Sequence, residues 1–205
     1  MKTTPKFYNC LEETKKEVLS LIFQGVKKRE SKFHNVVLNT IGLESRPEAR
    51  TVVIRKFCRD ELTLNIHSDK RSRKIKEIKT NNNVSLNFYD DQKKIQLRVR
   101  GKAIIENSKK NSWNELNNWS KRCYLTIDSP GKISKYPTSG FPGKFAHSPP
   151  SHDESEIGFV NFALIKVFIN EIEWLFLASH GHRRALFKIN RNNSKIDIAS
   201  KWMVP

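Results

Sequence analysis

The segment from residue 50 to residue 101 decides the fold, and it reads RTVVIRKFCRDELTLNIHSDKRSRKIKEIKTNNNVSLNFYDDQKKIQLRVRG. Residues 50–55, 62–68, 84–89 and 96–101 are short runs that are rich in β-branched residues or alternate between apolar and polar side chains. Acidic and amide residues interrupt these runs, so the pattern predicts antiparallel strands connected by hairpins. Cationic and hydroxyl side chains fall at the strand ends. Strand pairing would gather them as a phosphate-bearing ligand requires.

A short helix is expected between the second and third of these strands. Ser72 is suited to cap a helix that runs to Lys79 and ends at the asparagines of 81–83. Its first turn would present free backbone amides beside Arg73 and Lys74, where the helix dipole and both cations stabilise an anion. An ordinary basic helix start on the surface would have the same local sequence, and only the flanking strands favour the anion site.

The rest of the chain indicates a single domain, residues 1–205, that is mainly β with flanking helices. Apolar residues recur at helical spacing from Leu11 to about Lys28, within an N-terminal helical region of residues 1–30. Ser108 could begin a second helix that runs to about Arg122, with Trp113 and Trp119 packed against the barrel. Residues 126–157 are rich in Pro, Gly and Ser and are expected to form a long loop.

Further strands complete a predicted barrel. One is expected at 36–41, a pair at 161–170 and 172–177, and two more at 184–188 and 195–204, the last reached through a turn at Asn192–Asn193. Seven or eight strands with two or three helices indicate a barrel and not alternating β-α-β units.

The composition limits the partners that the chain could have. A formal charge of +17 would attract any polyanion, but the charge is dispersed along the sequence, without a block of five or six like charges. Cys10, Cys58 and Cys123 show neither a disulfide framework nor zinc spacing. No segment approaches the length of a membrane span, so we expect a cytoplasmic protein that does not enter a membrane.

Common catalytic motifs are absent from the sequence. It contains no GxGxxG, Walker, HExxH or GxSxG motif, and no metal site is predicted. His180 and His182 are best explained by a polar turn, and His147 and His152 by solvated loop positions.

The ordered set of Arg50, Arg55, His67-Ser68, Arg73-Lys74 and Gln96 resembles the flavin-binding motif of the pyridoxamine 5′-phosphate oxidase family. That family has an Arg-Thr-Val-Leu-Leu-Lys strand, an aromatic-Thr pair, Ser-Arg-Lys and Gln-Val-x-Val-x-Gly. Arg55 stands here in place of the lysine, and His67-Ser68 in place of the aromatic-Thr pair. Residues 182–187 and 202–205 resemble the family's arginine-containing strand and its final strand, so the likeness covers about residues 36–205.

The resemblance implies an FMN-binding split β-barrel, present as a homodimer with FMN in the interface. Arg50, Ser68, Arg73 and Lys74 would hold the phosphate. The backbone of 52–54 would line the isoalloxazine ring, and Arg55 and Gln96 would bind its polar edge. Arg184 would reach the flavin from the other subunit. The full set of implied cofactor residues is Arg50, Thr51, Val52, Val53, Ile54, Arg55, His67, Ser68, Ser72, Arg73, Lys74, Gln96 and Arg184.

Departures from the family pattern concern the substrate. The family oxidase binds its substrate with an Arg-x-His turn, which reads His180-Gly-His182 here, and with a Tyr-containing helix followed by Arg and Ser, where this chain has residues 119–123, WSKRC. Only His182 is retained as a substrate residue. This argues against pyridoxamine 5′-phosphate oxidation itself and favours a likeness to shorter FMN-binding relatives that carry a Pro-Gly pair like Pro130-Gly131.

The sequence therefore predicts an FMN-dependent oxidoreductase whose substrate and catalytic residues it does not identify. Two alternatives stay open. One is a non-catalytic basic barrel that binds nucleic acid or another polyanion, although no nucleic-acid motif is present. The other is the same barrel with haem or a deazaflavin, because a fold does not determine function.

Overall fold

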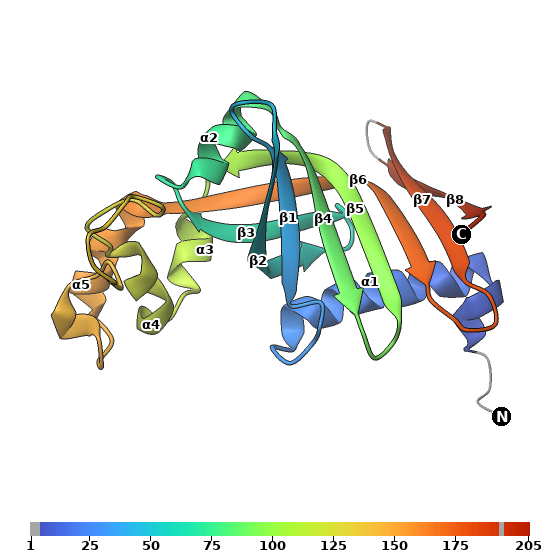
Figure 1. Cartoon of the computed structure of the whole chain (residues 1–205), viewed down its shortest axis with the longest axis horizontal. Helices are drawn as coiled ribbons and strands as arrows, with labels where there is room; N and C mark the ends of the chain where they lie inside the picture. The colour runs from blue at the N-terminus through green and yellow to red at the C-terminus, as the bar shows by residue number, and fades with distance from the viewer. Residues whose placement is uncertain (1–4, 193–194) are drawn as a thin grey trace.

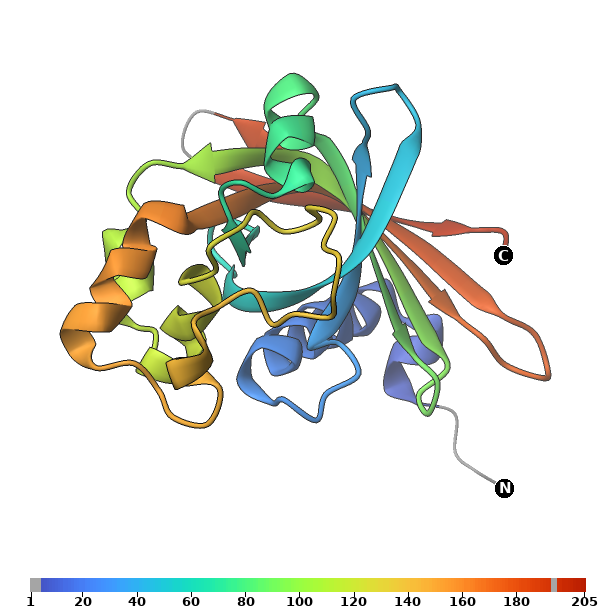
Figure 2. The ribbon, with the colours of Figure 1, turned by 60° about the vertical axis from the view of Figure 1, so that its left-hand side comes forward.

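The centre of the molecule is an eight-stranded antiparallel sheet in the order β3-β2-β1-β4-β5-β6-β7-β8. The computed structural model describes residues 5–192 and 195–205. An additional pairing between β3 and β6 closes six strands into a barrel, and β7 and β8 continue the sheet outside it (Figure 1, Figure 2). The strands are β1 (Asn35–Ile41), β2 (Pro47–Cys58), β3 (Thr63–Asp69), β4 (Asn83–Asp90), β5 (Ile95–Glu106), β6 (Phe162–Phe176), β7 (Arg183–Asn192) and β8 (Lys195–Met203).

Strand β6 makes the split in the barrel. Its first half pairs with β3, from Phe162 to Phe168, and its second half pairs with β7, from Glu171 to Phe176, while β5 lies along its other edge. The prediction of two paired strands at 161–170 and 172–177 is therefore wrong. Asn170 lies at a bulge between β5 and β6 and not in a turn.

Two residues allow β6 to change its partner from β3 to β7 at this position. A Cβ atom on Gly101 would lie 2.2 Å from the Phe168 carbonyl oxygen, so only glycine allows β5 to approach β6 this closely. On the other edge, the Arg191 guanidinium donates to the Ile169 carbonyl oxygen at 2.6 Å and to the Leu62 carbonyl oxygen at 3.2 Å. Arg191 thereby satisfies backbone acceptors where β3 and β7 separate.

The helices lie around the barrel. They are α1 (Leu11–Lys27), α2 (Arg73–Thr80), α3 (Lys110–Asn114), α4 (Asn118–Lys121) and α5 (His152–Glu156), with 3-10 turns η1 (Lys6–Asn9), η2 (Arg122–Tyr124), η3 (Gly143–Phe145) and η4 (Ile157–Asn161). Helix α1, which the apolar spacing predicted, runs beneath the barrel and buries Val18, Leu21 and Ile22 against it (Figure 1). Helices α3, α4 and α5 form a separate group beside β3 and the start of β6 (Figure 1).

This helical group differs from the sequence prediction. The expected single helix from Ser108 to Arg122 is two short helices, because Asn117 starts α4 by accepting a hydrogen bond from the Ser120 amide. The expected loop of 126–157 contains η3 and α5, and α5 begins with a capping box between Ser151 and Glu154. Trp113 is fully buried, as predicted, whereas Trp119 is 46% exposed and does not pack against the barrel.

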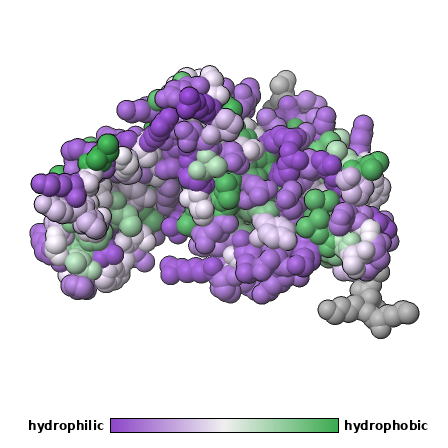
Figure 3. Space-filling model, viewed as in Figure 1, coloured by the Kyte–Doolittle hydropathy of each residue, from purple (hydrophilic) through white to green (hydrophobic). Residues whose placement is uncertain are grey.

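The face shown in Figure 3 is largely hydrophilic, in keeping with the net charge. Within the described residues, no helix has the length and apolar character needed to cross a membrane. Those residues likewise contain no group of three or more His, Cys, Asp or Glu side chains that could hold a metal ion. The predicted turn at Asn192–Asn193 lies partly outside the described residues.

Candidate cofactor site

A cavity of about 300 Å³ opens where β3 ends and α2 begins. We call it the cofactor cavity. Ser68 in β3 and Ser72 before α2 place their hydroxyl oxygens 3.1 Å apart, and Lys74 Nζ donates to them at 3.2 and 3.3 Å. The cavity is lined by Thr51, Val52, Val53, Arg55, His67, Ser68, Asp69, Ser72, Lys74, Cys123, Tyr124 and Pro130.

Ser72 occupies the N-cap position that the sequence predicted, but its hydroxyl does not cap the helix. It faces Lys74 and Ser68 instead. Hydroxyl groups, a cation and the start of a helix thus converge on one small volume, which is the donor set that a phosphate dianion needs. The residues present therefore fit the phosphate of FMN.

The charge of Lys74 is incompletely compensated. Among the described residues, no carboxylate lies within ion-pair distance of its Nζ atom. Burial lowers the pKa of Lys74, and the positive charge of Arg50 lowers it further, while Asp69 and Glu77 act in the opposite direction. An anion in the cavity would relieve both effects, because it would replace lost solvation and supply the missing countercharge.

Two other predicted phosphate ligands are held by a buried carboxylate. Glu77 is fully buried and accepts hydrogen bonds from Arg50 Nη2 at 2.7 Å and from Thr40 Oγ1 at 2.6 Å. The Nε atom of Arg73 lies 3.4 Å from its other oxygen. Neither Arg50 nor Arg73 lines the cofactor cavity, and the 57% exposure of the Arg73 side chain leaves it on the surface.

Asp69 plays the same role for a third arginine. Its carboxylate accepts from Arg71 Nε at 3.0 Å and from Arg71 Nη2 at 2.7 Å. Arg71 also donates to the Thr126 hydroxyl at 2.7 Å, which ties the segment after Tyr124 to the edge of the cavity. Sequence reasoning missed Glu77 and Asp69. Glu77 could have been noticed as the single acid in the basic helix RKIKEIKT.

Strand β2 forms the second wall of the cavity. Thr51, Val53 and Arg55 face outward, whereas the side chain of Ile54 is fully buried in the barrel core, so only its backbone could face a ligand. The β2–β3 register shifts between Ile54 and Lys56, which places Arg55 at an irregularity beside the cavity. Strand β2 thus brings Thr51, Val53 and Arg55 to the same cavity.

His67 stands between the cofactor cavity and the neighbouring surface. Its ring packs edge-on against Phe162 with centroids 5.0 Å apart. Burial lowers the pKa of His67 to about 4, with a further contribution from the charge of Arg55. His67 is therefore neutral at physiological pH and can donate or accept a hydrogen bond without adding charge. Beside it, burial raises the pKa of Tyr124, so its hydroxyl stays protonated.

Three predicted site residues lie elsewhere on the chain. Gln96 in β5 is opposite Leu175 in β6, and Leu175 is opposite Arg184 in β7, so the three form one row on one face of the sheet. Arg184 pairs with Glu173 at 2.8 Å, which also holds Arg98 at 3.1 Å. His182 accepts from the Ala178 amide at 3.1 Å in the turn before β7. None of these residues lines the cofactor cavity of its own chain.

A closed barrel extended by two strands, with a cavity at the junction of β3 and α2, defines the chain as a split β-barrel protein, as predicted. Two solved structures share this fold. A pyridoxamine 5′-phosphate oxidase-related, FMN-binding protein from Nostoc punctiforme superposes with a TM-score of 0.70 at 23% identity, covering 93% of this chain and 96% of that one. PhzG from Burkholderia lata, solved with tetrahydrophenazine-1-carboxylic acid, gives 0.69 at 14% identity, covering 100% and 99%.

Sequence comparison finds the same likeness. The model for the pyridoxamine 5′-phosphate oxidase FMN-binding domain matches residues 15–107, so this part of the chain is similar to that family. Pyridoxine/pyridoxamine 5′-phosphate oxidase 2 from Arabidopsis thaliana is 30% identical over 124 residues, which are 60% of this chain. The match spans 63% of that relative, less than two thirds of its length. The predicted resemblance to this family is thus confirmed, and the matched family model is that of an FMN-binding domain, as expected. The roles of individual residues stay predictions.

Proposed function

We propose that the chain is an FMN-dependent oxidoreductase that holds the cofactor phosphate in the cavity between β3 and α2. The observation that carries this proposal is the Lys74 ammonium group, which lies between two serine hydroxyls without a carboxylate partner among the described residues. Arg50 and Arg73 both contact the buried Glu77 on the adjoining helix α2. FMN, when bound, supplies two-electron transfer that no side chain of the protein can provide.

The ring of the cofactor would follow strand β2. Val52, Val53 and Arg55 line the same cavity as Lys74, so the backbone of 52–54 and the Arg55 guanidinium would lie beside the ring. His67 and Tyr124 are both uncharged at neutral pH, because burial shifts their pKa values away from it. They would cover the ring without competing for its polar edge.

We further propose that the protein works as a homodimer, because one chain does not bring Gln96 and Arg184 to its own cavity. A second copy could present this row of the β5–β7 face to the cavity of the first. Coexpression of Lys74→Met chains with Arg184→Ala chains tests the idea. Each variant alone should retain little FMN, whereas random pairing should restore about one quarter of the sites. Failure to restore any would argue against a shared site.

The first experiment on the cofactor is direct. Purified protein is mixed with excess FMN, desalted and analysed by absorbance and by chromatography of the released ligand. Retention of about one FMN per chain is expected. Absence of bound FMN after this treatment would refute the proposal. With the loaded protein, pyridoxamine 5′-phosphate is expected to give no turnover, because His180 replaces the arginine of the family's substrate turn.

A further inference from the structure

Residues 127–139 leave the body of the molecule and return to it at one point. We call them the tip loop. The Ile127 amide donates to the Gly140 carbonyl oxygen at 2.9 Å, which closes the base of the loop. Gly140 has a φ of +79°, a left-handed conformation that favours glycine, and a Cβ atom there would lie 3.2 Å from the Thr126 side chain. In Figure 2 this part of the chain, drawn in yellow, lies in front of the barrel. The segment is therefore an Ω-type loop with a narrow base.

The base of the tip loop is tied to the segment that forms the cofactor cavity. Besides its bond to the Thr126 hydroxyl, Arg71 donates to the Thr126 carbonyl oxygen at 3.1 Å and to the Ile127 carbonyl oxygen at 3.2 Å. Arg71 is held in turn by Asp69, which directly follows Ser68 in β3. The segment between β3 and α2 thus carries both the hydroxyls of the cavity and the anchor of the loop.

The rest of the tip loop is not fixed in this way. Among the residues that the structure describes, every hydrogen bond and ion pair of residues 128–139 stays within the loop and its base, as in the contact of Lys132 with Asp128 at 2.6 Å. Two large side chains of the loop face solvent, because Ile133 is 96% and Tyr136 is 69% exposed. Burial of these side chains on a nearby surface would be favourable, and nothing but local contacts would be lost.

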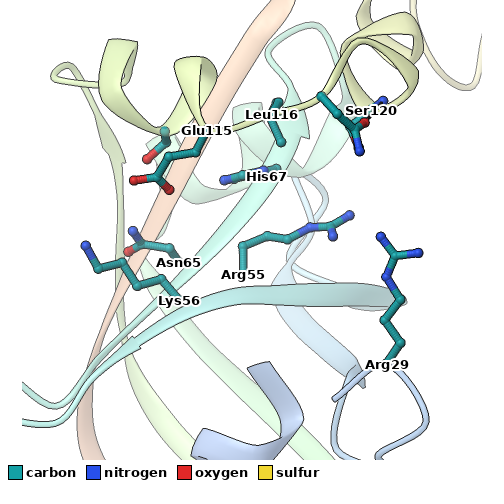
Figure 4. Close-up of a pocket in the computed structure, with 10 residues that line it drawn as sticks. Arg29, Arg55, Lys56, Asn65, His67, Glu115, Leu116 and Ser120 are labelled. Atoms are coloured by element: carbon teal, nitrogen blue, oxygen red, sulfur yellow. Dashed lines mark hydrogen bonds between the residues drawn. The ribbon is translucent and has the colours of Figure 1, made fainter. Parts of the chain in front are cut away.

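The cofactor cavity leaves room for an additional cover. Its volume is about 300 Å³, whereas ligand pockets commonly have about 300–1,000 Å³ and bury about 70–90% of the ligand surface. Arg55 and His67 also line a neighbouring pocket, and Figure 4 shows Leu116 and Ser120 across that pocket from them. A cofactor with a tricyclic ring would therefore stay partly open to water unless another segment covered it.

We propose that the tip loop is a lid that closes over the cofactor cavity when FMN is bound and buries Ile133 and Tyr136 there. Pro130 already lines the cavity, so the loop reaches it without moving its base. The adjacent Gly131 has a φ of +86° and no atom within 4 Å of its Cβ position, which leaves space for the loop to bend. This inference rests on the proposed function, because FMN supplies the surface that the loop would cover. Closure would exclude water from the flavin and slow its release.

Limited proteolysis of the full chain tests closure. Trypsin can cut after Lys132 and Lys135, which are both exposed in the tip loop, and mass spectrometry of the peptides gives the rate at each bond. The control is the bond after Lys93, in the exposed turn between β4 and β5. Saturating FMN should slow cleavage in the loop at least about tenfold, because cleavage then requires reopening, and leave the control bond unchanged. Equal rates in the loop with and without FMN, or equal protection of the control bond, would overturn the inference.

A substitution in the lid gives a second measurement. Ile133→Asp should not affect folding, because the side chain is exposed, but a closed lid would bury the new charge. FMN release, followed by flavin fluorescence after dilution of the loaded protein, should therefore be at least about tenfold faster than in the wild type. Ile157→Asp is the matched control, since Ile157 is 70% exposed and lies in η4, outside the loop. An unchanged release rate in Ile133→Asp, or an equal acceleration in Ile157→Asp, would count against the lid.

The two proposals can fail separately. If the wild type retains no FMN, the proposed function is wrong. If FMN is retained but the tip loop is cut as fast as in the empty chain, the cofactor site stands and only the lid is refuted.

Discussion

Replacement of Lys74 by methionine separates recognition of the cofactor phosphate from the stability of the fold. Among the described residues, Lys74 Nζ donates side-chain hydrogen bonds only to the hydroxyls of Ser68 and Ser72. Its lowered pKa reflects burial first and the charge of Arg50 second, and no carboxylate of the described residues lies within ion-pair distance of it. The substitution should therefore leave the free energy of unfolding unchanged or slightly higher. Loss of a charge-assisted hydrogen bond of about 1.5–3 kcal/mol should weaken FMN roughly 10- to 150-fold.

The assay compares FMN with riboflavin, which lacks the phosphate. Both ligands are titrated into the wild type, Lys74→Met and Lys76→Met, and quenching of the flavin fluorescence gives the Kd. Lys76 is the control, because it lies on the same helix but is exposed and does not line the cavity. Riboflavin affinity should be the same in all three proteins. The reasoning is refuted if Lys74→Met weakens both ligands equally or leaves FMN unaffected.

Three further substitutions test other features of the structure. In the wild type, the pKa of His67 is about 4 in the folded chain and 6.5 in the unfolded chain, so between these values the unfolded chain binds more protons. The free energy of unfolding therefore falls as the pH drops from 6.5 to 4. His67→Phe should remove this loss of stability in acid. The effect is on the order of 3 kcal/mol, and urea denaturation across this pH range would contradict it if the wild type and the variant lose stability in parallel. Glu77→Gln leaves Arg50 without its buried partner and should destabilise the chain by about 3 kcal/mol in urea, and a change below about 1 kcal/mol would show that the ion pair is not important for stability. Gly101→Ala should lower Tm strongly, because its Cβ would collide with the Phe168 carbonyl oxygen, whereas Gly143→Ala, with no atom within 4 Å of the new Cβ, should melt like the wild type.

The strands of residues 50–101 could be predicted because their alternation follows burial directly. In β5, Ile95, Leu97 and Val99 are buried while Gln96 and Arg98 point outward, so the sequence period and the structure agree. The α5 helix was also detectable, since Ser151 and Glu154 have capping-box spacing. The continuity of β6 was not, because the change of partner near Asn170 depends on the distant strands β3 and β7.

The candidate site was predicted in part, for a similar reason. The local motif identified Ser68, Ser72 and Lys74, which the fold does bring together. It also included Arg50, although the fold directs that side chain to Glu77. Whether an arginine faces a ligand or a carboxylate is decided by contacts between segments that are far apart in sequence. The pairing of Arg50 with Glu77 links residues 27 positions apart and is not encoded in either strand or helix alone.

These pairings explain how a chain with a net charge of +17 can still have a defined anion site. Glu77 and Asp69 hold Arg50 and Arg71 in ion pairs. Lys74 and Arg55 line the cavity itself, and neither has a carboxylate partner among the described residues. An anion is therefore expected to bind where positive charge is unpaired, and not where positive charge is most abundant. A polyanion would contact the dispersed surface charge weakly and would lose affinity as the salt concentration rises, whereas a compact phosphate gains hydroxyl donors and a desolvated ammonium group at one position.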